Sequence, residues 1–299
     1  MRSFRRLAPF LVLTLLCSAQ QSTFTKVKVR FSKPDDRRMF DKDVDLAFND
    51  VEKRLITRGE HNPISVPYDD VQKVVFDVSR HMRGGAMSQV VGGLVGAAIA
   101  AQRVNDYWMY IEYKGKDGKS VPYLVEVDKD NAETIINKAK SIFGDRVQET
   151  SFPEVATDIE KNTLKDLQSK HEMEPNKKDH PLPELKADKA LVVIACPSLA
   201  ARYAGKGIQF KFHANDKVVA VNKWGTYSFV YLDPGEYTLV SQTENASAIK
   251  IKLEAGKDYY FLQNTFMGAW KAKTGLSRHA KELVMYEIDG AYYADWKAK

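Results

Sequence analysis

The chain has 299 residues, of which 44% are hydrophobic and 28% are charged, as in a soluble globular protein. This composition argues against a wholly disordered chain and against a polytopic membrane protein. The formal net charge is +6. Because Arg2, Arg5 and Arg6 of the N-terminal segment supply part of it, the remaining excess is too small to indicate a nucleic-acid partner.

The N-terminal segment has the layout of a secretory signal peptide. Its three arginines precede an apolar run over 7–16, and Cys17-Ser18-Ala19 supplies small residues for cleavage. The apolar run is too short to be a stable membrane span. We therefore predict that residues 1–19 are a signal peptide and that the mature protein is exported to the periplasm or the extracellular space.

The sequence contains two cysteines, Cys17 and Cys196. Loss of Cys17 with the signal leaves Cys196 alone, so no intramolecular disulfide can form. Lipidation of Cys17 is the alternative, but Leu16 stands where bacterial lipoprotein signals usually carry a small residue. We favour simple cleavage after Ala19 over a lipoprotein, and we expect Cys196 to be a small, buried thiol.

A first domain is predicted over 23–148, beginning with short β-prone runs. Val27, Val29 and Phe31 alternate with Lys28 and Arg30, which is typical of a half-buried strand. The expected strands of this domain lie at 26–31, 44–48, 54–57, 64–66, 74–79, 107–113 and 121–127.

One helix is predicted to close this domain. Asp130 is placed to cap its N-terminus, with Glu133 three residues later, and Gly144 offers a left-handed stop. Its apolar stripe, which needs a sheet to cover it, consists of Ile135, Ile136, Ala139, Ile142 and Phe143. Antiparallel strands followed by one amphipathic helix indicate an α+β domain.

Three motifs of this domain support a resemblance to known proteins. They are VPYDDV at 66–71, YWMYIEY at 107–113 and VDKDN at 127–131. Together with the order of the elements, they resemble a pleckstrin-homology-like (PH-like) module of bacterial exported proteins of unknown role. The resemblance implies a PH-like barrel with a closing helix.

An uncharged, Gly- and Ala-rich segment, 84–102, interrupts this pattern. Gly92, Gly96 and Ala100 have the small-xxx-small spacing that lets another backbone approach closely. We consider three interpretations: packing against its own domain, packing against a copy or partner, and membrane contact. The candidate interaction surface consists of Met87, Val91, Gly92, Leu94, Val95, Gly96, Ile99 and Ala100.

A linker is predicted over 150–189, where charged residues and turn formers are dense. Residues 158–170 have enough apolar periodicity for about three helical turns. The stretch EPNKKDHPLP at 174–183 is expected to be extended and solvated, which would leave the two domains free to reorient.

A second domain is predicted over 190–296 as an antiparallel β-sandwich. Strand runs separated by turn residues recur about every ten residues, and apolar positions alternate with lysines in several of them. The expected strands lie at 190–195, 208–212, 217–221, 227–231, 236–242, 248–253, 259–263 and 282–286. The aromatic side chains are expected mostly in the core, with one exposed aromatic row on the strand at 259–263 as an option.

Two motifs of this domain, PGEYTL at 234–239 and LEAGKDYY at 253–260, resemble the bacterial domain of unknown function 2846 family, which is similar to PEGA-type surface β-domains. The resemblance implies a β-sandwich of secreted proteins and lipoproteins with no known catalytic residues. The sequence departs from the family by an insertion over 267–279, before the last expected strand.

A search for catalytic and binding motifs finds none that is specific. Only two residues separate the glycines of 115–120, whereas a phosphate-binding loop has four between them, so this segment is interpreted as a hairpin turn. Pro175 stands where a metalloprotease helix beginning at His171 would need its second histidine. His213 is interpreted as a surface or hydrogen-bonded residue rather than a metal ligand, and no nucleophile-elbow motif is present.

The leading hypothesis is a mainly β, non-enzymatic, two-domain binding or structural protein of the bacterial envelope, with a protein or envelope partner. No catalytic residue, cofactor, metal, nucleotide or nucleic acid is expected. Two alternatives stay open. One is a secreted hydrolase with dispersed carboxylates, and the other is a peripheral protein that contacts the membrane through 84–102.

Overall fold

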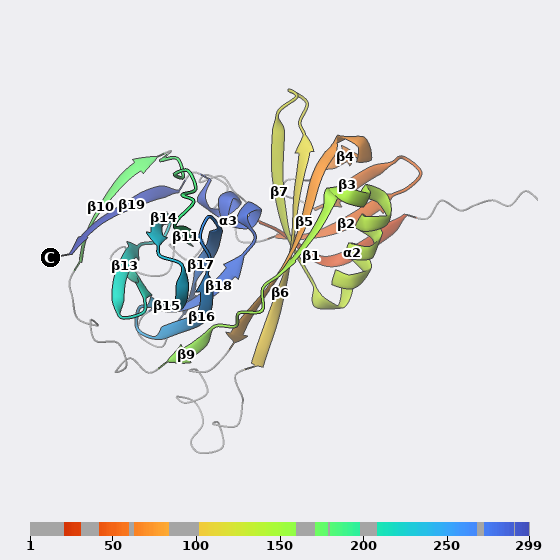
Figure 1. Cartoon of the computed structure of the whole chain (residues 1–299). Coiled ribbons are helices and arrows are strands. Elements are labelled where there is room, and N and C mark those ends of the chain that lie inside the picture. Colours follow the sequence, from red (N-terminus) through yellow and green to blue (C-terminus); the bar gives the residue numbers. More distant parts are fainter. Residues whose placement is uncertain are drawn as a thin grey trace, which may run out of the picture.

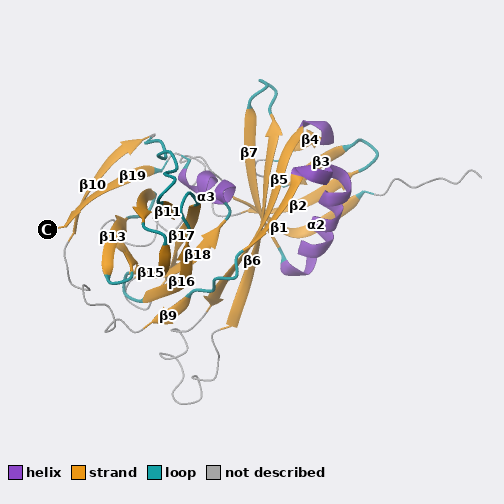
Figure 2. Ribbon diagram, viewed as in Figure 1, coloured by secondary structure: helices purple, strands orange, loops and turns teal. Residues whose placement is uncertain are grey.

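The computed structural model describes residues 21–30, 42–59, 63–83, 102–159, 171–178, 180–197, 208–267, 272–289 and 291–298. The described chain is mainly β, with strands arranged in three sheets and two α-helices, α2 and α3 (Figures 1 and 2). The predicted signal peptide with Cys17, the whole candidate surface within 84–102 and most of the expected helix at 158–170 lie outside the described residues. No helix of the described part is long and apolar enough to cross a membrane.

The first half of the molecule is built on one eight-stranded sheet in the order β4-β3-β2-β1-β7-β6-β5-β8. All neighbouring pairs are antiparallel except β5 and β8, which run parallel. The seven strands predicted for this region are confirmed, and an eighth strand, β8, was not predicted. The strands are β1 (Ser22–Arg30), β2 (Lys42–Asn49), β3 (Arg54–Arg58), β4 (Ser65–Pro67), β5 (Val71–Arg83), β6 (Gln102–Lys114), β7 (Ser120–Val127) and β8 (Val147–Ser151).

Helix α2 (Lys129–Phe143) covers one face of this sheet and confirms the predicted closing helix. Gly144 ends it with a φ of 55°, in the left-handed region. The predicted cap is wrong, because Asp128 and not Asp130 is the N-cap residue and accepts a hydrogen bond from the Asp130 backbone N–H at 3.0 Å. Asp128 directly follows β7 and keeps an extended backbone, as an N-cap residue does.

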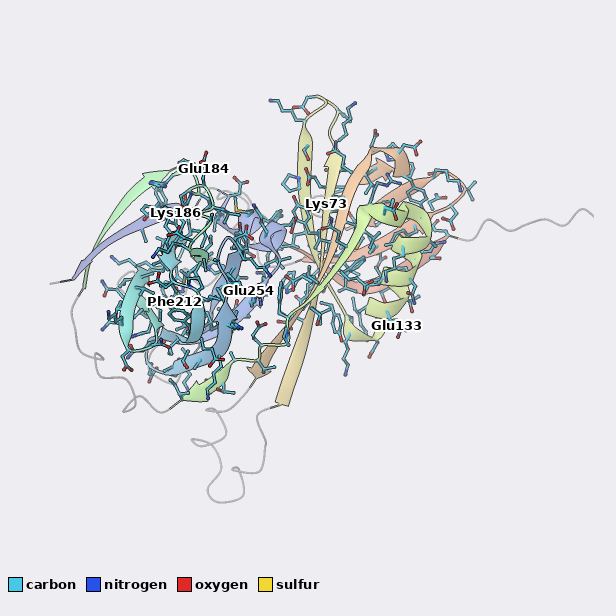
Figure 3. All side chains as sticks on the ribbon, viewed as in Figure 1. Lys73, Glu133, Glu184, Lys186, Phe212 and Glu254 are labelled. Carbon is cyan, nitrogen blue, oxygen red and sulfur yellow. The ribbon has the colours of Figure 1, made fainter. Side chains whose placement is uncertain are left out.

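The second half contains two sheets that pack face to face over a shared apolar core. Their orders are β10-β19-β14-β11-β17-β18 and β13-β12-β15-β16-β9. Phe212 lies between them, whereas Glu133 lies on the outer side of α2 in the first half (Figure 3). The strands that were predicted correctly here are β11 (Ala190–Cys196), β12 (Phe210–Ala214), β13 (Lys217–Asn222), β14 (Thr226–Leu232), β15 (Gly235–Gln242), β16 (Ala246–Leu253) and β17 (Asp258–Met267).

The C-terminal elements differ from the predictions. The expected strand at 282–286 belongs to helix α3 (Lys281–Ile288), because a short apolar run that is buried on several sides has no periodicity to separate helix from strand. The expected insertion at 267–279 contains strand β18 (Ala272–His279), which pairs with β17. Its buried Thr274 and Ser277 resemble loop residues in the sequence. The last strand is β19 (Tyr292–Ala298).

The expected solvated connector is also partly wrong, because it adds edge strands to both sheets of the second half. Strand β9 (Thr157–Ile159) pairs with β16, and β10 (His171–Lys178) pairs with β19. Pro175 lies at a register shift of β10. An edge strand has one free side that faces water, so charged residues and a proline are accommodated there.

The two halves are packed together rather than free to reorient. Trp108 of β6 and Leu124 of β7 face away from α2 and join a core cluster with α3 and the strands β11 and β17. Their neighbours Met109 and Val125 face α2, as the two-residue period of a strand requires. Helix α3 therefore lies between the eight-stranded sheet and the second half (Figure 2).

Candidate functional site at the junction of the two halves

Charged side chains cross the junction at several points. Nη1 of Arg30 on β1 lies 2.7 Å from Oε1 of Glu287 on α3, and the side chains are only 16% and 6% exposed. The Arg30 guanidinium also lies over the Trp108 ring, 4.4 Å from its centroid. Lys73 of β5 pairs with Glu282 of α3. These pairs fix α3 against the eight-stranded sheet.

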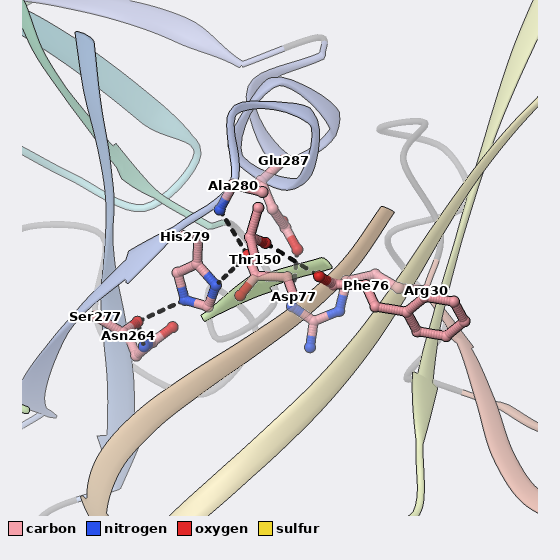
Figure 4. A network of polar contacts seen from close by, with 9 residues as sticks. All are labelled: Arg30, Phe76, Asp77, Thr150, Asn264, Ser277, His279, Ala280 and Glu287. Atoms are coloured by element: carbon pink, nitrogen blue, oxygen red, sulfur yellow. Dashed lines mark hydrogen bonds and ion pairs between the residues drawn. The ribbon is translucent and has the colours of Figure 1, made fainter. Parts of the chain in front are cut away.

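A buried Asp–His–Ser network forms the centre of the junction (Figure 4). Asp77 of β5 is 2% exposed, and His279 and Ser277 of β18 are 4% and 1% exposed. Nδ1 of His279 lies 3.3 Å from Oδ2 of Asp77, and its Nε2 lies 2.7 Å from Oγ of Ser277. The same Asp77 oxygen accepts the backbone N–H of Ala280 at 2.6 Å.

The hydrogen-bond partners of Ser277 and His279 indicate which atom is the donor in each bond. Nδ2 of Asn264 donates to Oγ of Ser277 at 2.7 Å, and the Ser277 hydroxyl can then donate to Nε2 of His279. The remaining ring proton on Nδ1 is donated to Asp77. The arrangement therefore places a proton of the His279 ring on Nδ1, an assignment made from the hydrogen-bond partners.

This connectivity is that of a nucleophilic triad, but its surroundings favour a structural role. Ser277 is 1% exposed, and no residue of the network lines any of the three cavities described below. A substrate has no access to its hydroxyl in this arrangement. Since Asp77 and His279 lie 202 residues apart in the sequence, the network joins β5 of the first half to β18 of the second.

Beside this network, a cleft of about 400 Å³ opens between the two halves. We call it the junction cleft. Three parts of the molecule supply its lining: the eight-stranded sheet, the connector after β10, and the second half with α3. The lining residues are Tyr110, Pro122, His180, Pro181, Leu182, Tyr227, Glu282, Met285, Tyr286, Ile288, Asp289 and Ala291.

The connector segment 180–186, which we call the strap, is held at the cleft by aromatic side chains of the second half. The His180 ring stacks on Tyr293 with centroids 4.2 Å apart. Tyr227 donates its hydroxyl to the His180 carbonyl, and Tyr231 donates to the Glu184 carbonyl. The strap therefore covers Tyr227 and Tyr231 of β14.

Burial and acidic neighbours raise the pKa of two tyrosines near α3, Tyr110 of the cleft lining and Tyr260 beneath the helix. Burial, and then the charges of Glu112 and Glu282, raise the pKa of Tyr110, so that this phenol keeps its proton. Burial, with the hydrogen bond to Asp258 and the charge of Glu282, likewise raises the pKa of Tyr260. The charge of Glu282 thus contributes to the raised pKa of both Tyr110 and Tyr260.

Several residues singled out in the sequence have structural partners. Burial raises the pKa of Cys196, which is 1% exposed and fits the predicted unreactive thiol. Nε2 of His213 lies 2.8 Å from the side-chain oxygen of Gln242, as expected for a hydrogen-bonded histidine. The 115–120 turn is confirmed, with Gly118 at a φ of 80°. The exposed aromatic row is not found on β17, because Tyr260 is 4% exposed beneath α3.

The sequence interpretation missed both the Asp77 network and the junction cleft. His279 is one of several scattered histidines, and neither Asp77 nor Glu282 lies in a motif. No linear spacing signals residues that the tertiary structure brings together. Among the described residues no three His, Cys, Asp or Glu side chains are grouped as metal ligands. Neither a protein-family model nor a curated protein matches the sequence, so the junction has to be interpreted from its own geometry.

Proposed function

We propose that this chain is an exported, non-enzymatic binding protein of the bacterial envelope that holds its ligand in the junction cleft. The observation that carries the proposal is the cleft itself, which is lined by both halves and by the strap that connects them. Small-molecule sites are concave, mostly apolar with a few polar groups, and frequent at domain interfaces. The volume and the lining of the junction cleft match that description.

The packing around the cleft supports a preformed site. The Arg30–Glu287 pair, the Asp77 network and the apolar cluster around Trp108 hold the cleft walls in place. A preformed site binds at a lower entropic cost than one that must be ordered by its ligand. We therefore interpret the buried polar network as the device that holds the cleft in shape.

The finer fold assignments belong to the same proposal. Residues 23–148 are interpreted as a PH-like module and 190–296 as a β-sandwich related to the domain of unknown function 2846 family. Antiparallel strands closed by α2 support the first assignment, and two sheets over one core support the second. Neither fold carries a function by itself, so the ligand is argued from the cleft.

Filling the cleft tests the proposal. Met285 is partly exposed on α3 and lines the cleft, so Met285→Trp adds bulk there with little cost to folding. Leu182→Trp fills the cleft from the strap, and Leu185→Trp is the control because Leu185 lies on the same strap, is 50% exposed and does not line the cleft. Far-UV circular dichroism and thermal unfolding verify that each variant is folded.

The readout is ligand-observed NMR of the mature chain with a library of small anionic, neutral and cationic fragments. We expect a set of fragments to bind the wild type and Leu185→Trp and to weaken about tenfold or more in Met285→Trp and Leu182→Trp. The proposal is wrong if no fragment binds or if the filling variants bind as well as the control. Turnover of a glycoside or ester substrate that Glu282→Gln abolishes would favour the hydrolase alternative instead.

Export is tested separately. The proposal expects periplasmic or extracellular material that begins at Gln20, and mass spectrometry of the purified protein measures this terminus. Cytosolic protein with an intact Met1 would contradict export. A lipid on Cys17 would show a membrane-anchored lipoprotein in place of simple cleavage after Ala19.

A further inference from the structure

The strap lies on an aromatic surface of the second half. Tyr227, Phe229 and Tyr231 occupy every second position of β14 and so share one face of that strand. Tyr293 lies opposite Tyr227 on the neighbouring strand β19, and its ring centroid is 5.0 Å from that of Phe229. All four side chains belong to the same apolar cluster. We call these four residues the aromatic face.

The sequence of the strap restricts its backbone to an extended conformation. Each of its two prolines, Pro181 and Pro183, fixes its own φ and disfavours a helical backbone in the residue before it. The peptide bonds before both prolines are trans. Residues 180–183 therefore favour a polyproline helix, which makes no internal backbone hydrogen bonds and leaves its carbonyl groups to outside donors.

Two hydrogen bonds join the strap backbone to the aromatic face in matching register. Tyr227 donates to the carbonyl of His180. Four residues later on both segments, Tyr231 donates to the carbonyl of Glu184. Four residues span about 13 Å of a β-strand and about 12 Å of a polyproline helix, so the spacing of the hydroxyls matches that of the carbonyls. Because every residue has a backbone carbonyl, these two bonds can form with another extended segment as well.

Three side chains of the strap add contacts to those two bonds. The His180 ring stacks on Tyr293, with centroids 4.2 Å apart. Nζ of Lys186 lies 4.2 Å from the centroid of the Tyr231 ring, a cation–π contact. Leu182 packs against the apolar cluster of the junction. The strap is thus bound as a short peptide ligand is bound, through a few anchors along an extended backbone.

The strap is held at its surface only. It contains no strand or helix of its own, and Leu182 and Pro183 are only partly buried. Its exposed residues are Pro181, Glu184, Leu185 and Lys186. A segment with so little buried area exchanges more readily than a strand of the sheet, because few contacts have to break.

An aromatic surface that contacts an extended, proline-rich segment is a known mode of peptide recognition. We propose that the aromatic face docks a proline-rich segment of a partner protein and that the strap occupies this face in the same chain until the segment replaces it. The segment has the chemistry of the strap: two prolines separated by an apolar residue, with a basic residue three positions after the second proline. This site is separate from the ligand of the junction cleft and goes beyond the proposed function.

A synthetic peptide with the strap sequence HPLPELK tests this docking. Because the strap is tethered, it competes at an effective concentration of about millimolar, so the wild type should bind the free peptide weakly. The strap variant Pro181→Gly with Pro183→Gly loosens the competitor and should bind the peptide about tenfold more tightly. Calorimetry or an NMR titration measures the affinity, and circular dichroism with thermal unfolding verifies that the variant is folded.

Variants in the strap-variant background assign the binding to the aromatic face. Tyr231→Phe removes the hydroxyl that donates to the peptide carbonyl and should weaken binding about fivefold. The matched control is Tyr113→Phe, because Tyr113 is a partly buried tyrosine that packs against the core under α2. The control should change the affinity by less than about twofold. A peptide with alanines in place of both prolines should bind about fivefold more weakly, because it is not preorganised.

Three outcomes would overturn the proposal. The first is a folded strap variant that does not bind the peptide. The second is equal binding by Tyr231→Phe and Tyr113→Phe, which would place the peptide elsewhere. The third is a wild-type dimer, measured by light scattering, that the strap variant loses, because the occupant of the aromatic face would then be the strap of a second copy.

The same variants separate this proposal from the proposed function. Tyr231 does not line the junction cleft, so Tyr231→Phe should weaken the peptide and leave fragment binding within about twofold. The strap variant is not used for the fragments, because Pro181 lines the cleft. If the peptide behaves as expected and no fragment depends on the cleft, only the cleft function falls. If fragments depend on the cleft and the peptide does not bind, only the docking of a proline-rich segment falls.

Discussion

The eight-stranded sheet is covered by a helix on each of its two faces, and the two contacts are built differently. Under α2 the buried residues of sheet and helix are almost all apolar, as with Phe76, Met109 and Ile135. Under α3 the sheet presents two largely buried charged residues beside Trp108 and Leu124. Arg30 pairs with Glu287 of the helix, and Asp77 binds His279 and the Ala280 N–H at the start of the helix. The α2 face is held mainly by apolar burial, and its polar pairs lie at the edge, whereas the α3 face combines apolar burial with buried polar pairs.

This contrast explains how the molecule joins its halves. Helix α2 directly follows β7, so its contact is local in sequence and rests mainly on apolar burial, with the Lys138–Asp50 ion pair and the Asn131 hydrogen bond to the Thr25 carbonyl at its edge. Helix α3 follows β18 and belongs to the second half, so its contact with the sheet closes a long loop. Hydrogen bonds and ion pairs there specify a single orientation, which a cleft formed by both halves needs.

The largest expected effect is at the ion pair beneath α3. Glu287→Ala leaves the guanidinium of Arg30 buried without its carboxylate and should lower the free energy of unfolding by about 3–5 kcal/mol. Urea denaturation measures this. The double variant Arg30→Met with Glu287→Leu is the control, because replacing both charges by apolar groups should recover most of the loss. A single variant as stable as the wild type would show that the pair is solvated.

On the other face, Ile135→Ala should cost about 2–5 kcal/mol, since Ile135 is fully buried between α2 and the sheet. The matched control is Asn137→Ala on the exposed side of the same helix, which should not destabilise the protein because alanine is the better helix former. Unlike the loss in Glu287→Ala, the loss at Ile135 should not depend on salt or pH. Salt dependence of this loss would contradict an apolar contact.

The α2 face also contains a phenol whose titration reports on its burial. Burial raises the pKa of Tyr123 to about 12, against an opposing hydrogen bond with Thr57. Because the folded protein holds this proton more tightly than the unfolded chain, the contribution is present below about pH 10 and is lost as the pH rises towards 12. Relative to Tyr123→Phe, the wild type should lose about 2–3 kcal/mol over that range. Equal alkaline losses in both proteins would contradict the burial of this phenol.

A smaller loss is expected at the centre of the junction. Asp77→Ala leaves the Ala280 N–H and the His279 ring without their acceptor and should cost about 1–3 kcal/mol. Asp69→Ala, at an exposed position, is the control. If the network maintains the cleft, Asp77→Ala should also weaken every fragment that the cleft binds. Unchanged fragment binding in Asp77→Ala would show that the network does not maintain the cleft.

The smallest effect is at the start of α2. Asp128→Ala removes the side-chain oxygen that accepts from the Asp130 backbone N–H and should cost about 1 kcal/mol. Asp130→Ala is the informative comparison, because the sequence predicts Asp130 as the cap. Thermal unfolding should show a clear loss for the first variant and little for the second, and the reverse order would restore the sequence prediction.

Much of the α2 face was predictable. The stripe from Ile135 to Phe143 and the stop at Gly144 are local patterns, and the alternation on β1 indicates which residues face the core. The predicted cap lies two residues too late because Asp128 and Asp130 stand on either side of Lys129 and only the backbone geometry distinguishes the two acidic residues. Local signals thus identified the helix and missed its first residue.

The α3 face was not predictable in the same way. The run Leu283–Ile288 is equally compatible with a strand, and only its burial between two layers decides for a helix. The sequence of β10 is charged and contains a proline, so it carries no strand signal, although β10 pairs with β19 at a sheet edge. Asp77, His279 and the lining of the cleft come from elements far apart in the chain, so no spacing could indicate them.

The mainly β character, most strands and the helix that closes the first sheet follow from the order of residues alone, because two-residue and helical periodicities are present along the chain. The packed molecule was needed to place α3, β10 and β18, to bring polar side chains together at the junction and to open the cleft. Those features depend on contacts between residues that are distant in sequence, and such contacts leave no periodic trace in either partner.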